Sequence, residues 1–354
     1  MTAPAAPTSL LAIAARVEAR LAEVLAFEEA RWAEFDPDLA GPVGEIGRLV
    51  LGGGKRLRPA FCHWGYVGAG GDGDDPIVAD AGAAFELMHS FALFHDDVMD
   101  AAASRRGQPT THTVFADRHQ AEGWAGEARR FGEGVAILVG DLAFVYADQL
   151  LAGANPQAWS IWNELRIELN IGQLLDIAGS VRNERRLHKA ERICRYKSGK
   201  YTIERPLHLG AVLAAPQRAL ELLPALSAYG LPLGDAFQMR DDVMGAFGDP
   251  EITGKPVGGD LREAKPTPLM AHAVAAANAA QAEVLALVGR TDLTDLDVAR
   301  VQQAIIDTGA LAKLESTIES LNAEAVAAIG RAPITDQARE ELIVLADFVS
   351  RRQV

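Results

Sequence analysis

The stretch FALFHDDVMDAAASRRGQPTTH, residues 91–112, places three carboxylates directly after a run of aromatic and aliphatic residues. On a helix, Asp96 and Asp100 lie four positions apart on one face, with Asp97 beside that face. Like charges at this spacing repel one another, and burial strengthens the repulsion. Magnesium removes it, because the ion binds carboxylate oxygens and completes its shell with water and substrate phosphate oxygens. The stretch therefore predicts a magnesium site completed by a phosphorylated ligand, against the alternative of a solvated acidic helix end.

A second stretch, RDDVMG at residues 240–245, repeats the tetrapeptide DDVM of the first. Asp241 and Asp242 form its carboxylate pair, and Gly245 stands where the first copy has its third carboxylate. Both copies precede a basic loop rich in Gly and Pro. The basic residues of these loops are Arg105 and Arg106 in the first, and Lys255, Arg262 and Lys265 in the second. Two such clusters facing one cavity would hold several magnesium ions around one diphosphate.

A third motif, GGGKRLRP at residues 52–59, joins a flexible glycine turn to clustered cations. It is not a P-loop, because the GxxxxGK[ST] spacing is absent. Arginine grips a phosphate through two hydrogen bonds and lysine supplies a point charge. Lys55 and Arg58 therefore predict phosphate binding, against the alternative of a basic surface patch. With Lys197 and Lys200 further along, the number of cations suits two diphosphates.

The whole chain of 354 residues has a helical texture, dominated by Ala, Leu, Glu and Arg. The predicted helices cover residues 8–33, 42–51, 57–68, 76–101, 110–121, 127–152, 156–180, 187–198, 199–214, 217–246, 266–289, 295–309, 311–330 and 336–354. The longest break, residues 247–268, is expected to be functional. No repeat or shift in composition marks a linker. We therefore expect one all-α domain over residues 1–354, with residues 1–8 as a loose tail.

Composition and charge exclude several classes of protein. A net charge of −14 disfavours nucleic-acid binding, but it leaves room for a locally positive pocket that binds an anion. Cys62 and Cys194 have no CxxC partner, which predicts reduced, packed thiols in a cytosolic protein. The N-terminus does not resemble a signal peptide, and no window of about 18 residues stays apolar without a charge, so no transmembrane anchor is predicted.

Taken together, seven motifs resemble those of the trans-type isoprenyl diphosphate synthases, also called polyprenyl synthetases. In chain order they are GGGKRLRP, ELMHSFALFHDDVMD, RRGQPTTH, GQLLD, YKSGKYT, FQMRDDVMG and GKPVGGDLREAKPT. The resemblance implies an all-α helical bundle around a central cavity, a homodimer, and a cytoplasmic enzyme. It implies head-to-tail condensation of isopentenyl diphosphate with an allylic diphosphate, whose ionisation magnesium assists.

The resemblance also assigns roles to single residues. Asp96, Asp97 and Asp100 match the first aspartate-rich motif, and Asp241 and Asp242 match the second. These motifs would bind three magnesium ions bridged to the allylic diphosphate. The remaining matches are Arg105, Lys197 and Lys255 for the allylic diphosphate; Lys55, Arg58, His89 and Arg106 for isopentenyl diphosphate; and Ser198 and Gln238 along the nascent cation. Lys197 and Gln238 join the aspartates as predicted catalytic residues. The family's second motif commonly ends in Asp, so the residue that completes the metal shell at Gly245 stays open.

Product length in this family depends on the cavity below the first motif. Phe91, five residues before Asp96 and without a two-residue insertion in the motif, resembles the pattern of short-chain synthases. Met88 lies one turn further along the same helix and is the second predicted depth residue. We predict geranylgeranyl diphosphate as the product, with farnesyl diphosphate or a longer polyprenyl diphosphate as the alternative.

Three other functions were weighed against this one. A class I terpene cyclase usually carries an N-D-x-x-S-x-x-x-E motif, which is absent here. A metal-dependent phosphohydrolase could use His95 and Asp96 as metal ligands, but the second DDVM would then have no role. An inactive partner subunit would be expected to lose an aspartate motif, and the first is intact.

Overall fold

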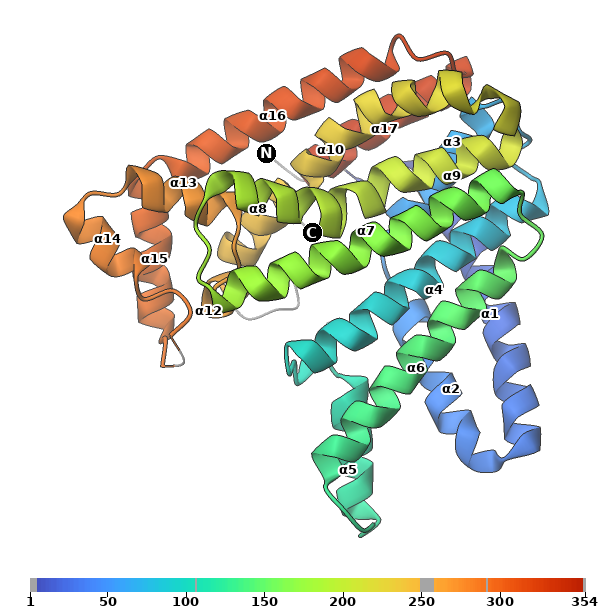
Figure 1. Ribbon diagram of the computed structural model, residues 1–354, viewed down its shortest axis with the longest axis horizontal. Coiled ribbons are helices and arrows are strands. Elements are labelled where there is room, and N and C mark those ends of the chain that lie inside the picture. The colour runs from blue at the N-terminus through green and yellow to red at the C-terminus, as the bar shows by residue number, and fades with distance from the viewer. Residues whose placement is uncertain (1–4, 106, 249–257, 291, 353–354) are drawn as a thin grey trace. The chain divides into compact units, whose positions relative to one another are not determined.

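The computed structural model describes residues 5–105, 107–248, 258–290 and 292–352. Helices make up most of the described chain, which confirms the predicted all-α class (Figure 1). Within the described ranges the only strands are β1 (Ser104–Arg105) and β2 (Gln108–Pro109), which pair antiparallel just after the first aspartate motif. This two-residue hairpin was not predicted from the sequence.

The chain divides into two compact units. The amino-terminal unit comprises Thr8–His63 and Asp72–Asn155, and the carboxy-terminal unit comprises Trp64–Gly71 and Pro156–Val354 together with Met1–Pro7. The single domain over residues 1–354 stays a prediction. The helix α3 (Leu57–Gly68) begins in the first unit and ends in the second.

The amino-terminal unit is built around one central helix. Its other elements are α1 (Thr8–Phe35), η1 (Pro37–Leu39), α2 (Ala40–Leu51), α4 (Pro76–Met99), α5 (Thr111–Ala121) and α6 (Ala128–Leu150). The helix α4 packs along α6 and also contacts α1 and α2. The predicted apolar stripe of α1, from Leu10 to Leu25, is buried. The predicted start of this helix at residue 8 is confirmed.

The carboxy-terminal unit is built around α10 (Ala219–Phe247), which packs against α16 and α17 (Figure 1). The other elements are α7 (Pro156–Val181), α8 (Leu187–Ile193), η2 (Cys194–Glu204), α9 (Arg205–Ala214), η3 (Pro216–Arg218), α12 (Gly259–Arg262), α13 (Pro268–Ala276), α14 (Ala279–Leu285), α15 (Asp295–Asp307), α16 (Ala310–Ile329) and α17 (Asp336–Arg351). Both cysteines of the chain are buried and free, as predicted.

Three predicted helices have a different form in the structure. Residues 194–204, expected as the end of the α-helix 187–198 and the start of the α-helix 199–214, form the π-helix η2. The predicted helix 266–289 is two helices, because Asn278 forms a capping box with Gln281 and begins α14. Wide turns of the π type occur frequently at functional sites, and η2 contains the YKSGKYT motif.

Glycines hold η2 close to two of its neighbouring helices, α7 and α10. A Cβ atom on Gly234 of α10 would lie 2.8 Å from the Cα of Gly199 in η2. A Cβ atom on Gly172 of α7 would lie 2.6 Å from the Cα of Lys197 in η2. Since real Cβ atoms do not approach so closely, only glycine allows these backbones to pack at this separation.

A buried polar network also joins η2 to α7, α9 and α10. Glu168 accepts hydrogen bonds from Lys200 and, at 2.7 Å, from Arg205. Nε2 of His208 lies 3.0 Å from Oγ of Ser227. Lys200, expected among the phosphate-binding cations, therefore stabilises the packing of η2. Burial, reinforced by the charge of Arg205, lowers the pKa of His208 to about 3.

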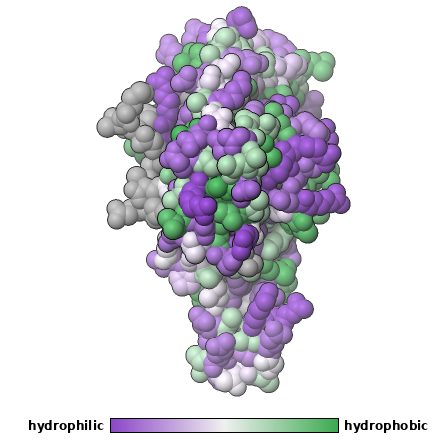
Figure 2. All heavy atoms as spheres, turned by 90° about the vertical axis from the view of Figure 1, so that its left-hand side faces the viewer, coloured by the Kyte–Doolittle hydropathy of each residue, from purple (hydrophilic) through white to green (hydrophobic). Residues whose placement is uncertain are grey.

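One helix, α4, is long and apolar enough to cross a membrane by length and composition alone. Within its most apolar window, however, 61% is buried in the structure, as expected of a core helix. Figure 2 shows a face of the molecule on which hydrophilic residues are interspersed with hydrophobic ones.

The glycine contact at η2 predicts the effect of one added methyl group. Gly234→Ala should lower the free energy of unfolding by about 1–3 kcal/mol, because the Cβ atom meets the Gly199 backbone, which cannot move aside without distorting η2. Urea unfolding followed by circular dichroism measures this. The control is Gly134→Ala in α6, where no atom lies within 4 Å of the new Cβ. Equal stability of the two variants would contradict the packing described.

Acid sensitivity should depend on His208. The unfolded chain protonates this histidine near pH 6.5, while the folded chain resists until about pH 3, so its contribution to stability is lost as the pH falls below 6.5. Between pH 7 and pH 5 the free energy of unfolding of the wild type should fall by about 2 kcal/mol more than that of His208→Gln. Urea titrations at both pH values test this. The exposed His188→Gln should behave as wild type, and an unchanged pH response in His208→Gln would contradict the prediction.

Candidate functional site

The first aspartate motif ends α4 and is paired with the hairpin that follows. Asp97 is buried, Asp96 is partly exposed, and Asp100 is exposed at the end of the helix. Arg105 in β1 donates to Oδ1 of Asp97 from Nε at 2.9 Å and from Nη2 at 2.7 Å. Burial raises the pKa of Asp97, and the hydrogen bonds from Arg105 oppose that rise. The predicted diphosphate-binding Arg105 thus also balances the charge of the predicted metal ligand Asp97.

The predicted depth residues lie on the same helix. The ring of Phe91 packs edge-on against Phe144 of α6, with centroids 4.8 Å apart, and against His95 at 4.6 Å. Phe91 is partly exposed, whereas Met88 is completely buried. Phe91 is therefore the more accessible of the two.

The glycine turn before α3 is tied to α4 by a buried ion pair. Arg56, which has φ of 50°, donates to Oε2 of Glu86 at 2.5 Å and to Oε1 of Glu18 at 3.1 Å. This pairing fixes the segment that carries Lys55 and Arg58, both of which are partly exposed. Sequence reasoning missed the structural role of Arg56. The signal was Glu86, three residues before His89 on an otherwise apolar helix.

The adjacent aspartates of the second motif have different partners. Asp242 is buried; its Oδ1 accepts from Nε2 of Gln238 at 2.9 Å, and Sγ of Cys194 lies 3.8 Å from its Oδ2. The carboxylate of Asp241 is partly exposed and accepts a hydrogen bond from Arg352. Gln238, predicted along the nascent cation, is therefore seen holding Asp242. The partners Cys194 and Arg352 were not predicted.

A third carboxylate occupies the space beside Gly245. A Cβ atom at Gly245 would lie 3.0 Å from Oδ1 of Asp260, and still nearer to other atoms of that carboxylate. Burial raises the pKa of Asp242 well above its usual range, and the charge of Asp260 raises it further. Lys265 donates to Oδ1 of Asp260 at 3.0 Å. Asp260 was not among the predicted residues. The sequence signal that could have indicated it is its position inside the GKPVGGDLREAKPT motif.

The YKSGKYT and GQLLD motifs meet within the carboxy-terminal unit. Lys197 of η2 donates a hydrogen bond to Asp176 of α7. Lys197 and the neighbouring Ser198 are both partly exposed. The predicted diphosphate ligand Lys197 is thus positioned by the π-helix and balanced by a carboxylate from α7.

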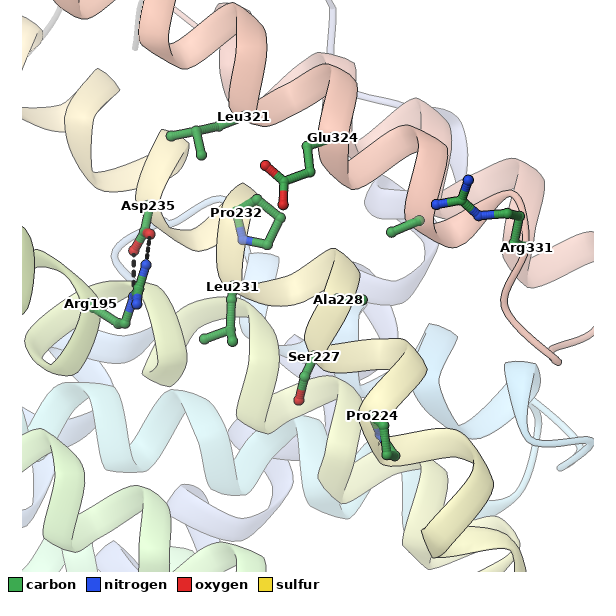
Figure 3. A pocket seen from close by; sticks show the side chains of 11 residues that line it. Arg195, Pro224, Ser227, Ala228, Leu231, Pro232, Asp235, Leu321, Glu324 and Arg331 are labelled. Atoms are coloured by element: carbon green, nitrogen blue, oxygen red, sulfur yellow. Dashed lines mark hydrogen bonds and ion pairs between the residues drawn. The ribbon is translucent and has the colours of Figure 1, made fainter.

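A cavity of about 540 Å³ lies between α10 and α16 (Figure 3). Arg195 and Asp235 form an ion pair of 2.5 Å along its lining, and Glu324 of α16 points toward Pro232 (Figure 3). None of the predicted site residues lines this cavity.

Two predicted site residues, Arg106 and Lys255, lie outside the described residues. Among those described, no three His, Cys, Asp or Glu side chains are grouped closely enough to hold a metal ion. The donor chemistry nevertheless fits magnesium. Both motifs offer carboxylate oxygens only, and Asp97 and Asp242 are buried. Burial raises the pKa of Asp242, and the charge of Asp260 adds a repulsion that a bound cation would relieve.

Comparison with known proteins agrees with this donor chemistry. The polyprenyl synthetase family model matches residues 44–305. The chain is 32% identical over 314 residues to the geranylfarnesyl diphosphate synthase of Aeropyrum pernix, covering 86% of this chain and 92% of that protein. It is 32% identical to the (2E,6E)-farnesyl diphosphate synthase of Mycobacterium bovis, covering 85% and 80%. Among solved structures, the geranylgeranyl pyrophosphate synthase of Corynebacterium glutamicum, complexed with isoprenyl diphosphate and magnesium, matches with a TM-score of 0.88 and 36% identity, covering 95% and 97%.

Proposed function

Since this chain belongs to the polyprenyl synthetase family and is a trans-prenyltransferase, we propose that it condenses isopentenyl diphosphate head-to-tail with an allylic diphosphate to give geranylgeranyl diphosphate. The observation that carries the proposal is the repeated DDVM motif. In both copies one carboxylate is buried, and an arginine from a separate segment pairs with a carboxylate of the motif. Buried carboxylates of this kind suit a site that handles a multiply charged ligand.

The aspartates of both motifs are the proposed metal ligands. Asp96, Asp97 and Asp100 would bind magnesium in the first, and Asp241 and Asp242 in the second. Three bound ions would neutralise the charge that develops on the departing diphosphate. We add Asp260 to the second set, because its carboxylate lies beside Gly245, where the family commonly has its last aspartate.

The cations bind the two diphosphates in this proposal. Arg105, Lys197 and Lys255 take the allylic diphosphate, and Lys55, Arg58, His89 and Arg106 take isopentenyl diphosphate. Arg105 and Lys197 each pair with a carboxylate, so a bound diphosphate would exchange one anionic partner for another.

The nascent allylic cation needs polar groups beside it and walls that exclude water. Ser198 and Gln238 supply the polar groups in this proposal. Gln238 has a second task, because its bond to Oδ1 fixes the orientation of Asp242.

Chain length is assigned to Phe91, with Met88 behind it. The relatives include synthases of farnesyl and of geranylfarnesyl diphosphate, so family membership alone leaves the product open. Geranylgeranyl diphosphate is favoured by the aromatic residue at position 91 and by the geranylgeranyl pyrophosphate synthase among the solved structures.

We further propose a cytoplasmic homodimer that pairs through α7. Five apolar side chains on this helix are exposed at spacings of three and four residues, which places them on one face. They are Ile167, Ile171, Leu174, Ile177 and Val181. Exposed apolar side chains gathered on one helix face are typical of a protein–protein interface.

Loss of one first-motif carboxylate should stop prenyl transfer. Asp96→Asn and Asp97→Asn should each lower kcat on the order of 10²-fold or more, because the amide removes a charge that balances bound magnesium. The measurement uses purified protein, labelled isopentenyl diphosphate, an allylic diphosphate and magnesium, with chromatography of the products. The exposed Asp117→Asn on α5 is the control and should keep wild-type activity.

The same assay contains the outcomes that would overturn the function. A cyclised hydrocarbon would identify a terpene cyclase, release of phosphate alone a phosphohydrolase, and no product an inactive partner subunit. Full activity of Asp96→Asn and Asp97→Asn would remove both residues from the metal site.

Product length should change with the residue at position 91. Phe91→Ala should shift the products to longer chains, because the ring that packs against Phe144 is lost and the space below the first motif deepens. Leu93→Ala on the same helix is the control and should leave the product unchanged. Chromatography of the dephosphorylated products decides. An identical product distribution for Phe91→Ala and wild type would assign chain length to another residue.

A further inference from the structure

The last described residue of the chain, Arg352, contacts the second aspartate motif. Its Nη2 donates to Oδ1 of Asp241 and, at 3.3 Å, to the backbone carbonyl of Phe237. Its guanidinium carbon lies 4.0 Å from the centroid of the Phe237 ring. Only 6% of Arg352 is exposed, so its guanidinium is buried against these groups and does not form an ordinary surface ion pair.

The C-terminal helix α17 is attached to α10 independently of Asp241. Nε of Arg240 donates to the carbonyl of Ser350 at 2.9 Å, and the same guanidinium pairs with Glu315 of α16 at 2.6 Å. The hydroxyl of Tyr229 donates to the carbonyl of Leu342 at 2.7 Å. These bonds hold α17 in place, and Arg352 follows its end in an extended conformation, with φ of −59° and ψ of 149°. Its side chain can therefore leave Asp241 without unfolding α17.

Arg352 and a metal ion compete for Oδ1 of Asp241. A guanidinium bound to a carboxylate neutralises its charge and occupies lone pairs that a divalent cation would use. Asp242 offers no simple substitute, because Gln238 and Cys194 contact its two oxygens. An ion that binds Oδ1 of Asp241 must displace the guanidinium.

We propose that Arg352 is an intramolecular counter-ion of the second aspartate motif, which must release Asp241 before magnesium binds there. The inference rests on the proposed function, because it takes Asp241 as a metal ligand. Its consequence is that the second motif binds the free ion weakly. A diphosphate that carries the ion and offers its own oxygens supplies the charge needed to displace Arg352. Arg352 is thus a positioning residue that couples loading of the second motif to arrival of the substrate.

The test measures binding of Mn²⁺, a spectroscopic substitute for magnesium, to the full chain without any diphosphate. Electron paramagnetic resonance reports the free ion during the titration. Arg352→Gln should bind Mn²⁺ about tenfold more tightly than wild type, and Arg352→Lys should remain close to wild type. The matched control is Arg351→Gln, which removes the same charge one residue away. Arg351 is exposed and pairs with Asp347 at 3.0 Å.

The outcomes separate this inference from the function on which it rests. Equal or weaker Mn²⁺ binding by Arg352→Gln, or equal tightening in Arg351→Gln, would overturn the counter-ion role. The tightening should disappear in the double variant Asp241→Asn/Arg352→Gln, and its persistence would also overturn the role. The prenyl-transfer assay tests the function itself, and activity with no effect of Arg352 on Mn²⁺ affinity would remove this inference alone. Circular dichroism of each variant establishes that α17 remains folded.

Discussion

The pairing of buried and half-buried carboxylates with cations from separate segments is the constraint on which the rest of the structure depends. An unpaired charge at low exposure is expensive, whereas a paired one is tolerated and fixes the geometry of both partners. The pairs at the candidate site are Asp97 with Arg105, Asp176 with Lys197, Asp241 with Arg352, and Asp260 with Lys265. Each pair joins two segments distant from one another or separated by a turn. The charges that would handle a diphosphate therefore also organise the segments that carry them.

Backbone packing at η2 sets where the charges of the carboxy-terminal unit lie. Gly172 and Gly234 bring α7 and α10 close to the π-helix, and a larger residue at either position would separate them. This packing sets the position of Lys197, because Lys197 lies on η2 and donates a hydrogen bond to Asp176 on α7. Cys194 reaches Asp242 for the same reason. A conformation that is uncommon for a helix is here maintained by close contacts on two sides.

Hydrophobic periodicity predicted the all-α class and most of the helices, because an amphipathic face shows directly in the sequence, as in α1. Periodicity could not reveal η2, since a π-helix and an α-helix differ in hydrogen bonding rather than in composition. The motifs indicated the candidate site residues, because their residue types and spacings can be read in the sequence. They did not indicate the partners of those residues. Arg56 with Glu86, and Asp241 with Arg352, join residues 30 and 111 positions apart. A single sequence can mark one member of such a pair, as Glu86 on an apolar helix does, but it does not say which residue is the partner.

Gly245 shows how a missing side chain can be part of a site. The sequence alone reads it as the loss of a carboxylate from the second motif. In the structure the space beside its Cα is filled by the carboxylate of Asp260, which any larger residue at position 245 would displace. Burial raises the pKa of Asp242, and the charge of Asp260 raises that pKa further. If Asp260 serves in the proposed metal site, its third carboxylate comes from α12 instead of α10. Glycine at position 245 is then a condition for that carboxylate, because a Cβ atom there would meet it.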